Sequence, residues 1–167
     1  MELFEAKQRF IETWGTLGTE WGISRSMAQI HALLLLAEQP MSADEIMDAL
    51  QIARGNANMN LRALMDWGLV RKELITGERR EYFSAHKDMW TVARQVISHR
   101  KKKELEPLFQ TIHLIHDINN KDTPEAAHFI SVVDDIRLFG EKADKMLSTL
   151  TSAERVWVMN TLLKFIR

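Results

Sequence analysis

Residues 42–84 constrain the fold more than any other part of the chain, because several local signals follow one another there at short intervals. Ser42 and Glu45 have the spacing of a capping box, which predicts that a helix begins immediately after Ser42. Residues 51–52 form a break. A second helix is then indicated by an apolar stripe at helical spacing, ended by a glycine at position 68; the stripe consists of Ala57, Leu61 and Leu64.

The residues after the second helix have the pattern of a β-hairpin. Residues 69–70 and 74–75 suit a first strand, and residues 82–83 suit the returning strand. The turn is expected at 76–78, which includes a glycine. Helix, turn, helix and hairpin in this order predict a mainly α protein built on a winged helix-turn-helix with a two-stranded wing.

The side of the second helix opposite its apolar stripe is polar. Asparagine and arginine side chains can form bidentate hydrogen bonds with adenine and guanine edges in the major groove, and a helix N-terminus attracts phosphate. A solvated face without a ligand is the alternative, but the helix-turn-helix and the basic wing favour DNA. The predicted DNA-binding residues are Arg54, Gly55, Asn56, Asn58, Met59 and Arg62 on the helix, with Arg79 and Arg80 in the wing.

The charge of the chain is unevenly distributed. The 167 residues carry a formal net charge of −1, which by itself does not indicate a nucleic-acid partner. Residues 51–103, however, hold twelve basic and five acidic residues, whereas residues 1–50 hold three and eight. Positive charge is therefore concentrated in and just after the predicted winged unit, as the neutralisation of DNA phosphates requires.

Composition excludes several other classes of protein. The chain has no cysteine, so it has no disulfide, no thiolate nucleophile and no cysteine-based zinc site. No apolar run approaches the roughly 18 residues that cross a bilayer, and the N-terminal residues lack the pattern of a signal peptide. A cytoplasmic protein is expected.

Apolar residues at helical spacing predict further helices on both sides of the winged unit, spanning residues 2–18, 25–38, 87–116, 124–139, 141–150 and 153–166. Pro107 is expected to kink or split the third of these, and Gly140 to end or interrupt the fourth. Thr123 should cap the helix that begins at Pro124, and Thr151 with Glu154 forms a second capping-box pattern.

These elements divide the chain into three predicted parts: an N-terminal packing and dimerisation helix (1–24), a winged helix-turn-helix domain (25–88) and a C-terminal helical dimerisation region (89–167). The C-terminal part carries more apolar surface than a thin domain can bury, which favours a two-fold dimer over a monomer with a self-packed tail. Such a dimer would hold two reading helices about 34 Å apart and match a pseudo-palindromic site.

Residues 53–70, 77–83 and 87–90 resemble the GbsR branch of the MarR-type transcriptional regulators, and in order of elements the resemblance extends over about residues 1–120. The resemblance implies a homodimeric winged-helix repressor or activator with dimer contacts from the terminal helices. By position it assigns 54, 55, 58, 59 and 62 to the recognition helix and 79 and 80 to the wing. Ala53 stands where the family often has a serine that caps the recognition helix. The absence of this cap lowers the stability of the helix by about 1 kcal/mol.

Some members of this branch sense choline or related quaternary ammonium osmolytes, which an aromatic cage can bind by cation–π attraction. Tryptophans at helical spacing are also ordinary core residues. The candidate effector-binding residues are Trp14, Trp21, Trp67 and Trp90.

Metal and catalytic sites are not expected, and neither is a cofactor. His113 and His116 share a helix face near Asp117, with His128 further along, but histidines near a helix end are commonly surface residues. The chain has no phosphate-binding glycine loop, no nucleophile elbow and no zinc-protease motif. The predicted function is therefore that of a non-enzymatic transcriptional regulator which reads a pseudo-palindromic operator as a homodimer under the control of a small-molecule effector. The alternative is a winged-helix module whose arginines bind an acidic protein partner.

Overall fold

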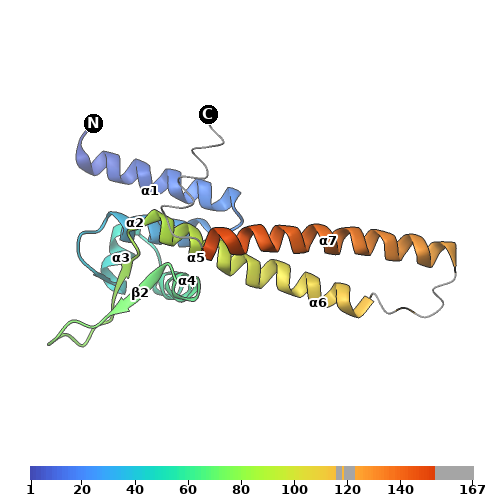
Figure 1. Ribbon diagram of the computed structural model, residues 1–167. Coiled ribbons are helices and arrows are strands. Elements are labelled where there is room, and N and C mark those ends of the chain that lie inside the picture. Colours follow the sequence, from blue (N-terminus) through green and yellow to red (C-terminus); the bar gives the residue numbers. More distant parts are fainter. Residues whose placement is uncertain (116–117, 119–122, 153–167) are drawn as a thin grey trace. The chain divides into compact units, whose positions relative to one another are not determined.

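The computed structural model describes residues 1–115, 118 and 123–152, and the chain divides after Gln95 into two compact units. The first unit contains α1 (Leu3–Glu20), α2 (Arg25–Leu36), β1 (Met41–Ser42), α3 (Ala43–Leu50), α4 (Arg54–Asp66), β2 (Val70–Glu73), β3 (Tyr82–Ala85) and the start of α5 (Met89–Arg100) (Figure 1). The second contains the end of α5, the π-helix η1 (Lys101–Leu105), α6 (Glu106–Ile115) and α7 (Pro124–Ser152). None of the described helices is long and apolar enough to cross a membrane.

The core of the first unit lies around α2, against which α1, α4 and α3 pack. The largest fully buried side chains come from three of these helices and are Ile30, Leu34, Ile46, Leu61 and Leu64. The stripe predicted for the second helix of the helix-turn-helix is buried as expected, since Ala57 is also 0 % exposed. Burial of this stripe fixes the rotation of α4 and turns its opposite side outward.

The predicted start and end signals around α3 and α4 are confirmed. The Ser42 hydroxyl accepts from the Glu45 amide at 3.3 Å, and the Glu45 carboxylate accepts from the Ser42 amide at 2.7 Å. Gln51 takes the left-handed conformation (φ 52°) in the turn between the helices. Gly68 (φ 67°) follows the end of α4, where the Leu69 amide donates to the Leu64 carbonyl.

The sheet has three antiparallel strands in the order β1–β3–β2, one more than the two predicted. The additional strand, β1, pairs Met41 with Phe83 and is too short for any periodicity to reveal it. Residues 74–75, predicted as strand, lie outside the sheet. β3 begins at Tyr82, opposite Glu73, so no partner strand remains for Leu74, which is 88 % exposed. The mainly helical winged helix-turn-helix is confirmed.

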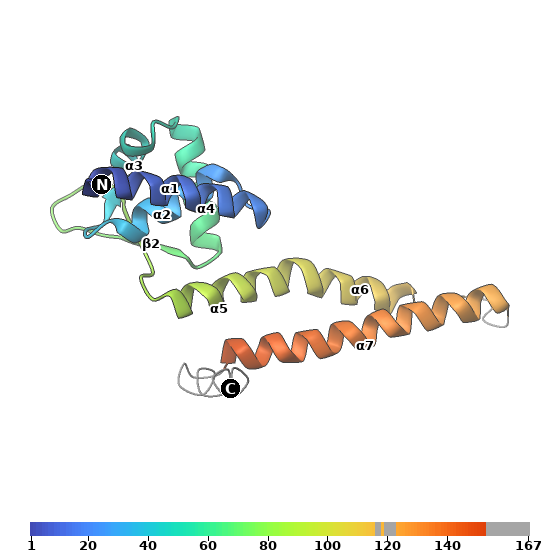
Figure 2. The ribbon, with the colours of Figure 1, turned by 90° about the horizontal axis from the view of Figure 1, so that it is seen from above.

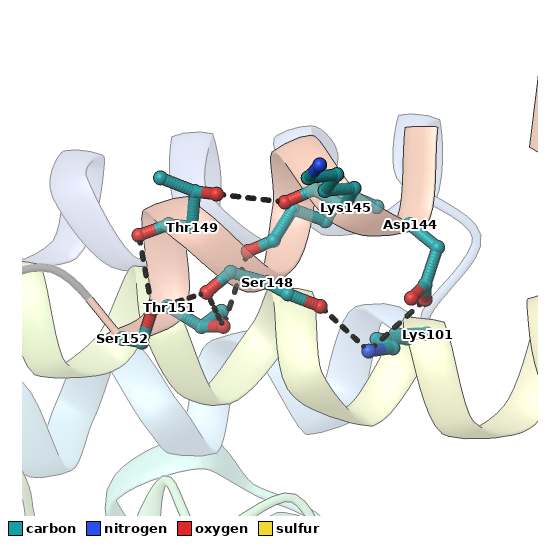
Figure 3. Close-up of polar contacts among 8 residues, drawn as sticks. Lys101, Asp144, Lys145, Ser148, Thr149, Thr151 and Ser152 are labelled. Atoms are coloured by element: carbon teal, nitrogen blue, oxygen red, sulfur yellow. Dashed lines mark hydrogen bonds and ion pairs between the residues drawn. The ribbon is translucent and has the colours of Figure 1, made fainter. Parts of the chain in front are cut away.

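The second unit is built on two antiparallel helical segments, η1–α6 and α7, which lie side by side in both views (Figure 2). The helix predicted around Pro107 stays helical but widens just before it into η1, where the Glu106 amide donates to the Lys101 carbonyl. Proline lacks an amide hydrogen and crowds the carbonyl four residues earlier, and a π segment relieves both problems. Figure 3 shows Lys101 joined to Asp144 (3.0 Å) and Ser148 (2.8 Å) of α7.

Two predicted boundaries in this unit are wrong. α7 continues through Gly140, where a Cβ would lie 2.8 Å from the Phe109 ring, so the glycine serves close helix packing and not helix ending. Thr151 begins no new helix: its hydroxyl donates back to the Leu147 and Ser148 carbonyls inside α7 (Figure 3). The Thr123 cap is confirmed by the 3.1 Å bond from the Ala126 amide. Glu154 and the helix predicted at 153–166 lie outside the described residues.

Candidate nucleic-acid interface

The outward side of α4 carries an exposed mixture of polar and apolar side chains. Five of the six residues predicted on this helix to bind DNA are exposed in the structure: Arg54, Gly55, Asn58, Met59 and Arg62. Because the opposite stripe is buried in the core, these residues are held on one face of a rigid helix. This face of α4 therefore exposes amide, guanidinium and thioether groups, and amide and guanidinium groups are able to bond base edges.

The N-terminus of α4 is open. Ala53 provides no side-chain cap, in agreement with the sequence, so the first amides of the helix keep their capacity to bind an anion. Arg54 forms a 2.7 Å ion pair with Asp44 of α3. A Cβ on Gly55 would meet no atom within 4 Å. Neither steric contact nor a positive φ within the first unit therefore requires glycine at this position.

Asn56 and Asn60 connect α4 with the start of α2. The Asn56 amide donates to the Ser26 hydroxyl at 3.2 Å, and the Asn60 amide donates to the Asn56 carbonyl at 2.9 Å. The Ser24 hydroxyl in turn donates to the Asn60 carboxamide oxygen at 2.9 Å. Asn56, predicted to bind DNA, is thus half-buried and bonded inside the protein. A contact between its side chain and DNA stays a prediction.

Asn60 was not among the predicted site residues. It is 4 % exposed, and its hydrogen bonds complete the network between α4 and α2. Its burial could have been predicted from its position, because it lies three residues after Ala57 and one before Leu61, on the stripe that faces the core. An asparagine at such a position needs hydrogen-bond partners from a neighbouring element. Here those partners are supplied by the N-terminus of α2.

The wing is the loop between β2 and β3, and it extends from the sheet away from the helices of the first unit (Figure 1). Gly77 (φ 88°) allows the turn at its tip, which the bond from the Glu78 amide to the Ile75 carbonyl closes at 3.1 Å. Arg79 and Arg80 follow and are exposed. The wing therefore holds two guanidinium groups clear of the domain core.

Some basic side chains of this region form ion pairs within the protein and others do not. Arg71 pairs with Glu73 at 2.7 Å, and Lys72 pairs with Glu81. Arg62 and Arg79, by contrast, form no hydrogen bond or ion pair within the described part of the chain. The pKa of Glu45 is lowered chiefly by its capping hydrogen bonds with Ser42, and Arg80 contributes only the smallest effect.

The four tryptophans predicted to bind an effector have different surroundings. Trp14 stacks on Phe10 at 5.4 Å and lies tilted against His31 at 6.2 Å. Trp21 is 57 % exposed, while Trp67 and Trp90 are half-buried. A cavity of about 500 Å³ lies between α1, α2 and α3, and no tryptophan lines it. A quaternary ammonium site at these residues stays a prediction.

No group of three or more histidine, aspartate or glutamate side chains converges into a metal site in the described ranges. His113 lines a small cavity between α6 and α7 together with Arg137 and Glu141. His116 and Asp117, considered with it from the sequence, lie outside those ranges.

The winged unit is similar to a known protein family. Residues 21–81 match the MarR family. The match spans α2 to the wing arginines, so the residues that form the exposed face of α4 lie inside it. The residues that match this family are therefore those that form the winged helix-turn-helix.

The fold resembles that of a crystallised transcriptional regulator, with a TM-score of 0.60 at 17 % identity over 86 % of this chain and 99 % of the other. S. aureus MepR in its DNA-binding conformation gives a TM-score of 0.41 at 14 % identity over 89 % and 96 % of the two chains. A Lactococcus lactis ZitR mutant in complex with DNA gives 0.34 at 19 % identity over 81 % and 97 %. No curated protein matches the chain.

Proposed function

We propose that the protein is a transcriptional regulator that binds double-stranded DNA through α4 and the wing. The observation that carries this proposal is the pairing of an outward helix face, with Asn58 and Arg62, and a projecting wing, with Arg79 and Arg80. The MarR family match and the fold support this function over a winged-helix module that binds an acidic protein.

In the proposed complex, α4 enters the major groove, where some of its exposed groups contact bases and others contact phosphates. Asn58 and Arg62 contact base edges, where a good bidentate pair contributes about 1–3 kcal/mol of discrimination. The uncapped amides at the start of α4 approach a phosphate, and Gly55 keeps that approach free of a side chain. The wing arginines contact the adjacent backbone or minor groove and add affinity with little base preference.

We further propose that the protein acts as a homodimer, with contacts from residues 1–24 and 89–167 around the winged domain 25–88. Two-fold symmetry would set two copies of α4 about 34 Å apart, which requires an operator of two inverted half-sites. A function on chromosomal DNA implies a cytoplasmic location. No enzymatic role is proposed.

The assignment to the GbsR branch, and with it a quaternary ammonium effector, rests on the resemblance of residues 53–90. The effector is testable by titrating choline and betaine while recording tryptophan fluorescence, because a cation against an indole ring changes its emission. A saturable change is expected if any of the four tryptophans forms the site. An unchanged spectrum at millimolar ligand would remove the proposal.

The DNA-binding function is tested by selecting duplexes from a random-sequence library with the intact chain. We expect enrichment of one pseudo-palindromic site, with half-sites separated by about one helical turn and an affinity that falls steeply with salt. Binding without any enriched sequence would contradict operator reading. Absence of duplex binding, together with binding to an acidic protein, would favour the alternative module.

A further inference from the structure

α7 carries two stripes of side chains at alternating spacings of three and four residues. The first faces α6 and η1, and its members include Ala126, Val133 and Gly140, all buried. The second lies beside it on the helix surface and is made by Phe129, Val132, Ile136, Phe139, Ala143 and Met146. We call this second set the outer seam.

The outer seam is uncovered by any residue that the structure describes. Phe139 is 75 % exposed and Met146 is 69 % exposed, with Val132 and Ile136 between 40 and 50 %. Its spacing of three, four, three, four and three residues is the pattern of a coiled-coil contact, in which apolar residues recur every 3.5 positions. An apolar stripe of this length on a helix indicates a helical partner.

A second copy of the same helix fits the seam when it runs antiparallel. With the two-fold axis between positions 136 and 139, Ile136 lies opposite Phe139 of the partner subunit. Val132 then lies opposite Ala143 of the partner subunit, and Phe129 opposite Met146 of the partner subunit. Each of the six apolar residues thus meets another member of the seam, as an isologous contact requires.

Charge decides between antiparallel and parallel alignment. Asp135 and Lys142 flank the seam on one side, both are exposed, and neither has a partner within the described residues. In the antiparallel alignment Asp135 lies beside Lys142 of the partner subunit, and the reciprocal pair forms as well. A parallel in-register alignment would place the same two residues against Gly140 and Leu147 of the partner subunit, where no charge is available.

We propose that α7 pairs with α7 of a second copy of this chain as an antiparallel seam centred between Ile136 and Phe139. The inference rests on the homodimer of the proposed function and specifies which surface forms it. It leaves the DNA-reading face of α4 outside the seam.

Cysteine cross-linking tests the alignment directly, because the chain contains no cysteine of its own. Val132→Cys and Ala143→Cys are prepared singly and as a co-expressed mixture, then oxidised. We expect a disulfide-linked dimer in the mixture and none in either variant alone, since position 132 meets position 143 of the other copy and neither position meets its own counterpart. Cross-linking of each single variant with itself would indicate a parallel seam and overturn the proposal.

Operator binding, measured on the uncross-linked samples, separates this inference from the proposed function. A chain that is dimeric by light scattering and binds its operator, yet forms no cross-link in the mixture, would overturn the seam and leave the function standing. A mixture that cross-links as expected but selects no DNA sequence would support the seam and contradict the function.

Two substitutions test the seam without cross-linking. Phe139→Glu brings carboxylates into the centre of the contact and should weaken dimerisation at least roughly 100-fold, because buried charges without partners are costly. Leu138→Glu is the matched control: Leu138 is also exposed on α7, but helical periodicity directs it away from both stripes. Equal dimer dissociation constants for the two variants, at equal helix content, would contradict the proposal.

Reversal of the flanking charges gives a rescue experiment. Asp135→Lys places two lysines together across the seam and should weaken the dimer roughly tenfold at low salt. Addition of Lys142→Asp restores opposite charges and should restore the dissociation constant. Two single changes that weaken the dimer without mutual rescue would show that these residues do not meet.

Discussion

At Gly55, the fold makes no steric demand for glycine. A side chain there would extend into open space, the backbone φ is not positive, and alanine favours a helix more than glycine does. The position instead lies at the uncapped start of the helix that we place in the groove. Packing therefore does not account for this glycine, and we propose that close approach to DNA does.

Gly55→Ala is therefore expected to separate stability from binding. The unfolding free energy should rise by about 0.5 kcal/mol through helix propensity. The affinity for operator DNA should fall roughly tenfold, equivalent to about 1.4 kcal/mol, because the methyl group obstructs the phosphate. Denaturant titration and a binding assay measure the two effects. An unchanged DNA affinity would show that this end of α4 does not approach the backbone.

Burial of His31 should make the stability of the protein depend on pH. It is 4 % exposed, its Nε2 has no hydrogen-bond partner within the described residues, and burial lowers its pKa to about 4. The unfolded chain, with an ordinary histidine pKa near 6.5, then binds a proton between pH 6.5 and 4 that the folded chain does not. Stability from this group is complete above pH 6.5 and is lost as the pH falls towards 4.

The expected loss is about 3 kcal/mol of unfolding free energy over that interval. His31→Leu should remove this part of the pH dependence, because leucine does not titrate. Urea denaturation of both chains at several pH values between 7 and 4 provides the comparison. Curves that fall in parallel would show that His31 does not titrate as burial dictates.

At the level of elements, the contact between α4 and α2 determines which side chains of α4 are exposed. Asn56 is bonded to Ser26 across this contact, whereas Asn58, two residues later, is exposed and makes no bond within the described residues. The sequence alone predicted the same role for both asparagines. Their difference depends on which side chains α2 places opposite, and that information is tertiary.

The two asparagines should therefore respond differently to removal. Asn56→Ala is expected to lower the unfolding free energy by about 1 kcal/mol, because a part-buried hydrogen bond is lost. Asn58→Ala should leave stability within about 0.5 kcal/mol of the native value while reducing base discrimination. Thermal denaturation and competition with altered operators measure both. A stability loss confined to Asn58→Ala would reverse our assignment.

The elements that sequence predicted well are those with local signals. The capping box of α3, the turn at Gln51 and the stripe of α4 all depend on residues a few positions apart. The errors arose where distant segments meet. β1 exists because β3 offers it a partner, and Gly140 continues a helix because the Phe109 ring packs against it.

In the candidate site, too, the features set by local sequence were predicted and those set by contacts between distant segments were not. Periodicity was sufficient to place Asn58 and Arg62 on the outward side of α4, because a buried stripe determines its opposite face. It could not distinguish available arginines from engaged ones. Arg54 reaches Asp44 and Arg71 reaches Glu73 only in the folded domain, while Arg62 stays without such a partner within the described residues.

At the scale of the whole molecule, the function that we propose has two separate requirements: a rigid helix and wing that contact DNA, and a second copy of the chain that supplies the other half-site. The first is met within residues 1–95, where the MarR family match lies. The second is assigned to surfaces such as the outer seam of α7. A chain impaired in the seam should therefore still contact DNA, with the weaker affinity of a single half-site.

The most direct test of DNA reading compares Arg62→Ala with Arg79→Ala on the selected operator, on operators altered one base pair at a time, and on random duplex. Arg62→Ala should cost about 1–3 kcal/mol on the operator and relax the preference at one base pair of each half-site. Arg79→Ala should weaken binding to all duplexes alike and reduce the dependence of log affinity on log salt by about one unit per neutralised phosphate. Equal losses for both variants on operator and random DNA would contradict the account in which α4 reads bases and the wing holds the backbone.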